Sequence, residues 1–92
     1  LLRRNRKELV MSIIDKEKQK EAKRVLAWLE NHANREDEEN SRVRAVYNSL
    51  PNGLKKRINE EKTTKADRID LNMATMGLQT FCPMLKISMT YL

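Results

Sequence analysis

The fold is decided by residues 16–33, which read KEKQKEAKRVLAWLENHA. A helix turns by about 100° per residue, so side chains three or four positions apart share a face. At this angle the apolar residues of the stretch fall together on one broad side: Ala22, Val25, Leu26, Leu29 and Ala33. The basic residues Lys16, Lys20, Lys23 and Arg24 cluster on the opposite side. The pattern predicts an amphipathic helix with one buried and one charged face.

The same helix is expected to run much further toward the N-terminus. Neither glycine nor proline occurs between Arg3 and His32, so we predict one long helix over about residues 3–33. Leu9 and Ile13, however, fall on its basic side. Either the helix breaks near residues 12–15, where Ser-x-x-Asp resembles a capping box, or its N-terminal end is buried on two sides. Burial on two sides would require a partner or a second copy of the chain.

Three further helices and a tail follow along the chain. Asn34 and the acidic residues after it predict a helix over 35–50, and Pro51-Asn52-Gly53 ends it with a turn. A short helix is expected over 53–62. The capping-box pattern at residues 64–67 opens a fourth helix, over 65–81. The apolar tail 83–92 alternates with period two, which is compatible with a strand, an extended tail or a final helical turn.

The size and composition indicate one all-α domain. The chain has 92 residues but only two glycines and two prolines, too few for a turn-rich all-β fold. We therefore predict a single helical domain over 1–92, a small bundle of three to four helices organised by the long N-terminal helix. Because so short a chain buries only a modest core, a homodimer is favoured over a monomer.

The composition also bears on compartment and anchoring. A single cysteine allows no disulfide within the chain, and no apolar region of a secretory signal follows the basic residues 1–7. No run reaches the roughly 18 apolar residues of a transmembrane helix. We expect an intracellular protein, cytoplasmic or nuclear, without a transmembrane segment.

Residues that could support catalysis are isolated. A nucleophile needs a base within hydrogen-bonding reach, but His32 is the only histidine and Cys82 the only cysteine. Metal cages need several such ligands, and no glycine-rich phosphate loop is present. We therefore expect no enzyme activity, no cofactor and no metal site. His32 is interpreted as a solvated residue at the helix end, and Cys82 as a buried or half-buried structural residue.

Three basic clusters carry the leading functional hypothesis. The formal net charge is +6, and residues 1–34 contribute +4 of it through nine basic and five acidic side chains. The clusters are Arg3, Arg4, Arg6 and Lys7; Lys16, Lys20, Lys23 and Arg24; and Lys55, Lys56 and Arg57. Such clusters favour a non-catalytic regulatory protein that contacts RNA or DNA along the backbone of a duplex. Interleaved acids weaken this hypothesis, and the few aromatic residues fall near apolar faces.

The C-terminal end carries the alternative hypothesis. Residues 71–92 hold four of the five methionines and a single charged side chain, Lys86. Methionine suits adaptable interfaces, so the alternative is a helical protein-interaction or antagonist module, oligomeric or bound to a partner protein. The interface residues expected are Leu9, Ile13, Met73, Met76, Met84 and Met89. The simpler interpretation is that this segment closes the core over the first two helices, and the two interpretations are compatible.

Overall fold

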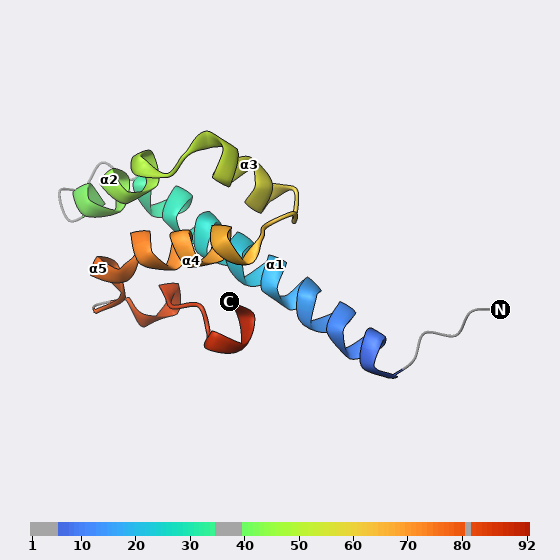
Figure 1. Cartoon of the computed structure of the whole chain (residues 1–92). Helices are drawn as coiled ribbons and strands as arrows, with labels where there is room; N and C mark the ends of the chain where they lie inside the picture. The colour runs from blue at the N-terminus through green and yellow to red at the C-terminus, as the bar shows by residue number, and fades with distance from the viewer. Residues whose placement is uncertain (1–5, 35–39, 81) are drawn as a thin grey trace.

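The computed structural model describes the backbone of residues 6–34, 40–80 and 82–92, with side chains from residue 13 onward in these ranges. Within them every regular element is helical and no strand occurs, so the all-α prediction is confirmed. The longest element is α1 (Arg6–Ala33), whose 28 residues span about 42 Å at 1.5 Å per residue. The remaining helices gather around its C-terminal half (Figure 1).

The organising helix is continuous. α1 passes through residues 12–15 without interruption, so the alternative of a break at Ser12–Asp15 is wrong. Its buried face is the expected one, formed by Ala22, Val25, Leu26, Leu29 and Ala33. Gln19 is the first buried side chain described along α1. The packed body of the protein therefore covers only the C-terminal part of the helix.

Two short helices follow on one side of α1. α2 (Ser41–Ser49) begins later than the predicted residue 35, and the acidic stretch 35–39 lies outside the described residues. α3 (Asn52–Asn59) follows Pro51 and ends before the predicted residue 62. Its end is a Schellman motif, in which the Glu61 and Lys62 amides donate to the carbonyls of Ile58 and Arg57. Glu61 occupies the left-handed position of this motif, with φ of 58°.

The predicted helix 65–81 is two helices, α4 (Lys65–Ala74) and α5 (Met76–Gln79). The capping box at its start is confirmed, since Thr64 and Asp67 exchange side chain-to-backbone hydrogen bonds. The interruption falls at buried Thr75, whose hydroxyl lies within hydrogen-bonding distance of the carbonyls of Leu71 and Asn72. A hydroxyl that bonds back to the preceding turn competes with the regular helix pattern and tends to bend the helix.

The C-terminal segment folds back onto α1 through two single turns of 3-10 helix, η2 (Pro83–Leu85) and η3 (Met89–Tyr91). The strand interpretation of this tail is wrong. Its period-two alternation still describes burial, because Leu85 and Ile87 are buried while Lys86 and Ser88 are exposed. The tail thus contributes two anchors to the core without pairing as a strand.

The core brings α1 together with the later helices and the tail. One buried cluster joins the buried face of α1 to Val43, Leu50, Leu54, Ile58, Leu71, Leu78, Leu85 and Ile87. The molecule measures 57 × 24 × 19 Å, and the N-terminal half of α1 extends away from the body along the long axis (Figure 1). No helix in the described ranges is both long and apolar enough to cross a membrane.

Candidate functional site

The first basic cluster falls mostly outside what the structure describes. Arg3 and Arg4 precede the described residues, while Arg6 and Lys7 belong to the first turn of α1 with side chains outside the description. The same holds for the side chain of Leu9. The roles predicted for these five residues stay predictions.

The second cluster forms an exposed stripe of mixed charge along α1. Lys20 pairs with Glu17 at 3.7 Å, and Lys23 pairs with Glu61 at 3.6 Å. Arg24 pairs with Glu21 at 2.9 Å and also donates to the main-chain oxygen of Met84. Lys16 is exposed and makes no ion pair with a described residue. Three of the four predicted phosphate contacts therefore have a carboxylate beside them.

The third cluster divides its side chains among different contacts. The Lys55 ammonium lies 4.2 Å from the centre of the Tyr47 ring, a cation–π contact between α3 and α2. Arg57 makes a bidentate pair with Asp67 at 2.8 and 2.9 Å. Lys56 is exposed and has no ion pair with a described residue. Two of the three cations are thus engaged in holding helices together.

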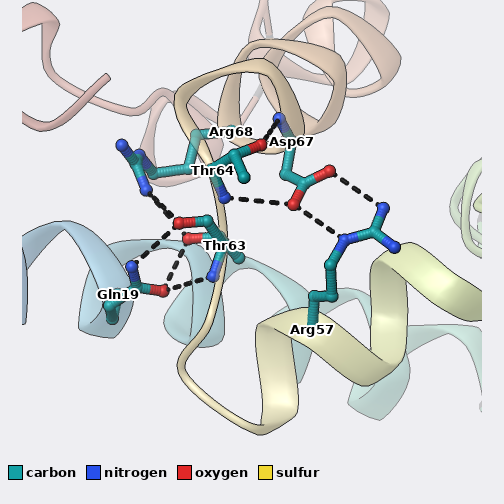
Figure 2. Close-up of polar contacts among 6 residues, drawn as sticks. All are labelled: Gln19, Arg57, Thr63, Thr64, Asp67 and Arg68. Carbon is teal, nitrogen blue, oxygen red and sulfur yellow. Dashed lines mark hydrogen bonds and ion pairs between the residues drawn. The ribbon is translucent and has the colours of Figure 1, made fainter.

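A buried polar joint connects α1 to the segment before α4 (Figure 2). The Gln19 amide donates to the carbonyl of Thr63 at 3.0 Å and accepts from the Thr63 amide at 2.8 Å. Arg68, also buried, donates to the Thr63 carbonyl and lies 3.1 Å from the main-chain oxygen of Leu92. Thr63 therefore joins the long helix to the start of α4, and Arg68 extends the joint to the main chain at Leu92.

The same joint continues to α3 through Asp67. The Asp67 carboxylate accepts from both Arg57 nitrogens and from the Thr64 amide, so three donors surround it (Figure 2). These donors stabilise its ionised form, and the hydrogen bond from Arg57 is the main reason that the pKa of Asp67 lies below its ordinary value. The pKa of Arg57 is raised by the same hydrogen bond.

The polar joint is structural in character. Every buried side-chain nitrogen or oxygen in the described part of the chain has a hydrogen-bond partner, so none is left over for a ligand. Sequence reasoning missed Gln19, Thr63 and Arg68. The available signal was the position of Gln19, a polar residue within the apolar face of the long helix.

The predicted interface methionines point outward. Met73 and Met84 are 62% exposed, Met76 is 60% exposed and Met89 is 83% exposed. Leu71, Leu78, Leu85 and Ile87, from the same part of the chain, are buried. Ile13 of α1 is also exposed, at 54%. The C-terminal region therefore both closes the core and presents large apolar side chains to solvent.

The two isolated reactive side chains take part in packing. The His32 ring stacks on Trp28 with centroids 3.8 Å apart and donates from Nδ1 to the Trp28 carbonyl at 2.9 Å. His32 is thus half-buried, whereas the sequence predicted a solvated residue. Cys82 is half-buried against the core, as predicted. Among the described residues no three His, Cys, Asp or Glu side chains gather as a metal site would require.

Comparison with known proteins gives no relative whose function could be considered for this chain. No family model, no curated protein and no solved structure matches the chain.

Proposed function

We propose that this chain is a helical protein-interaction module, and that residues 71–92, here called the methionine segment, contain its docking surface. The observation that carries the proposal is the exposure of Met73, Met76, Met84 and Met89, each between 60% and 83%. Lone exposed apolar residues are common on soluble proteins. Here four long apolar side chains are exposed within 17 residues of a segment that holds one charged residue.

The chemistry of the methionine segment favours an apolar occupant. Lys86 is its only charged side chain, so ionic contacts cannot supply most of a partner's binding energy. Methionine side chains are unbranched and polarisable, and they adapt to partners of different shape. The fold does not need these four side chains inside, because its buried core consists of leucine, isoleucine, valine and alanine. An apolar partner surface would remove them from water.

The occupant we propose is an amphipathic helix of a partner protein with acidic residues beside its apolar face. The net charge of +6 attracts acidic partners in general. Within the methionine segment Lys86 is exposed, and the Arg24 guanidinium, which also pairs with Glu21, lies against the main chain at Met84. Acidic flanks would meet these cations while the apolar face covers the methionines.

The test uses a displayed library of amphipathic helical peptides selected against the full chain. Peptides that bind should be enriched in acidic flanking residues. They should shift the NMR signals of the methyl groups of Met73, Met76, Met84 and Met89 on titration. The variants Met73→Lys/Met76→Lys and Met84→Lys/Met89→Lys should lose at least about tenfold in affinity, equivalent to about 1.4 kcal/mol.

The matched control places the same new charge elsewhere. Ala45 is exposed on α2, so Ala45→Lys should leave peptide affinity and the thermal melt unchanged. Because the four methionines are exposed, their lysine variants should also fold normally. Selected peptides that bind the methionine variants as tightly as the unmodified chain would overturn the proposal.

Contact with a nucleic-acid backbone remains the second candidate. It is favoured by the net charge and by exposed Lys16 and Lys56, which make no ion pair with a described residue. The exposed ion pairs of Lys20, Lys23 and Arg24 on α1 do not exclude nucleic-acid binding, since such pairs contribute only about 0–1 kcal/mol. It predicts binding to random RNA or DNA duplexes that weakens steeply with salt and is reduced in Lys16→Ala/Lys56→Ala. No shift of either duplex at low salt with micromolar protein would rule it out.

A further inference from the structure

The N-terminal part of α1 stands clear of the body of the molecule (Figure 1). By helical position Asp15 falls on the same side as buried Ala22 and Ala33, yet Asp15 is exposed. The chain's own core therefore no longer covers the helix at this point. Ile13 is 54% exposed. We call residues 6–17 of α1 the helical arm.

The helical arm has an apolar stripe of its own. At about 100° per residue, position 13 lies opposite the side that faces the core, and position 10 lies about 60° from position 13, between it and the edge of the core face. Leu9 and Ile14 flank these positions in the sequence. The centre of this stripe is turned away from the core face, and its described member Ile13 is exposed. Most of the stability of a helix in a protein comes from packing of its apolar face, so the arm would gain stability from a partner.

The charges on the same side specify which partner fits. Reading along the stripe, positions 6, 10, 13 and 17 are spaced by four, three and four residues and hold Arg6, Val10, Ile13 and Glu17. The stripe thus starts with a cation and ends with an anion, with two β-branched residues between them. Glu17 is only partly engaged, since its pair with Lys20 is 3.7 Å long and its side chain is 45% exposed.

We propose that two copies of this chain pair antiparallel through their helical arms. In this register Val10 faces Ile13 of the second copy and Arg6 faces Glu17 of the second copy, so each end of the contact joins opposite charges. A parallel pair would place Arg6 against Arg6 and Glu17 against Glu17. Antiparallel pairing also sets the two bodies at opposite ends, because each lies beyond the N-terminal end of the other arm. This inference does not depend on the methionine segment.

Charge reversal in the full chain tests the pairing, with sedimentation equilibrium as the measurement. The unmodified chain should show a monomer–dimer equilibrium. Glu17→Arg and Arg6→Glu should each weaken dimerisation by at least about tenfold, because each opposes like charges at both ends. The double variant Arg6→Glu/Glu17→Arg restores opposite charges and should return the dimer to within about threefold of the unmodified chain. Ile13→Lys should abolish it.

The control is Glu30→Arg, the same charge change at an exposed position of α1 within the body, which should leave dimerisation unchanged. At about millimolar concentration, sedimentation detects dimers whose free energy of association is only about 4 kcal/mol. A chain that stays monomeric at that concentration would overturn the proposal. A double variant that dimerises no more tightly than either single variant would also overturn the proposal.

Disulfide cross-linking tests the orientation separately in chains carrying Cys82→Ser, which removes the only native thiol. Mixed chains bearing Val10→Cys and Ile13→Cys should cross-link to each other in preference to themselves. Preferential cross-linking of each variant to its own kind would overturn the antiparallel arrangement.

Discussion

At the scale of single residues, Gln19 joins α1 to a segment 44 positions away in the sequence. Its amide satisfies both the carbonyl and the amide of Thr63, and all these groups are buried. We predict that Gln19→Ala lowers the free energy of unfolding by about 2 kcal/mol, because the buried amide and hydroxyl of Thr63 lose their acceptor, while the Thr63 carbonyl keeps its bond from Arg68. Urea denaturation measures the change. Lys18→Ala, next to it on α1, is the control, and a loss of less than about 0.5 kcal/mol for Gln19→Ala would contradict the prediction.

Asp67 makes stability depend on pH. Its pKa in the folded chain lies below the ordinary value of 3.8, so its stabilising contribution is fully present above the unfolded pKa and is lost as pH falls through the folded pKa. We predict that Asp67→Asn is less stable than the unmodified chain by about 1 kcal/mol at neutral pH, because the single amide oxygen cannot accept the hydrogen bonds from both Arg57 and Thr64. The difference in melting temperature should shrink as the pH drops below the ordinary value. A difference that does not vary between neutral and acid pH would contradict this.

Among the side-chain contacts, only the local ones could be predicted from the sequence. Thr64 and Asp67 are three residues apart at the start of an apolar repeat, so their capping box was recognisable. The pairs Gln19–Thr63 and Arg57–Asp67 depend on how helices pack, which no local pattern specifies. The same reason explains Arg24, whose contact with the main chain at Met84 joins positions 60 residues apart.

At the scale of elements, the end of α3 offers a direct test of helix termination. Glu61 occupies a left-handed position that usually holds glycine, because a side chain there costs about 1 kcal/mol. Its ion pair with Lys23 is half exposed and recovers at most a fraction of that cost. We predict that Glu61→Gly is more stable than Glu61→Gln by about 1 kcal/mol, since both variants lose the pair and only glycine relieves the backbone. Chemical denaturation of the two variants measures this, and the opposite ranking would contradict it.

Helix boundaries were predicted best where the signal is local. The long helix needed only an uninterrupted periodic stretch, and Pro51 separates α2 from α3 as its chemistry requires. The division of α4 from α5 was missed because it depends on the burial of Thr75. A threonine on the surface would leave its hydroxyl to water, whereas a buried one bonds back to Leu71 and Asn72. Burial is a tertiary property that the spacing of residues 65–81 does not contain.

At the scale of the whole molecule, the sequence predicted a chain that is charged at the front and apolar at the back. It could not assign the apolar residues of the back to the inside or the outside, since leucine and methionine are similar in hydrophobicity. The structure buries Leu71, Leu78 and Leu85 and exposes the four methionines around them. For a candidate site this is the decisive information, because an interface requires accessible side chains and a core requires hidden ones.

The separation between arm and body leads to the last prediction. Side chains are buried along α1 only from Gln19 onward, so removal of residues 1–14 should leave the core intact. We predict that the shortened chain melts within about 4 °C of the full chain when both are dilute, because a change of 1 kcal/mol shifts the melting temperature of a domain this size by about 4–8 °C. At high concentration the full chain should melt at higher temperature through mass action, while the shortened chain and full-length Glu17→Arg should not. Calorimetry across a hundredfold range of concentration makes the comparison, because stabilisation by dimerisation grows as the concentration rises past the Kd of the dimer. A shortened chain that melts much lower even when dilute would mean that the arm packs on its own body, and the basis for pairing two arms would be lost.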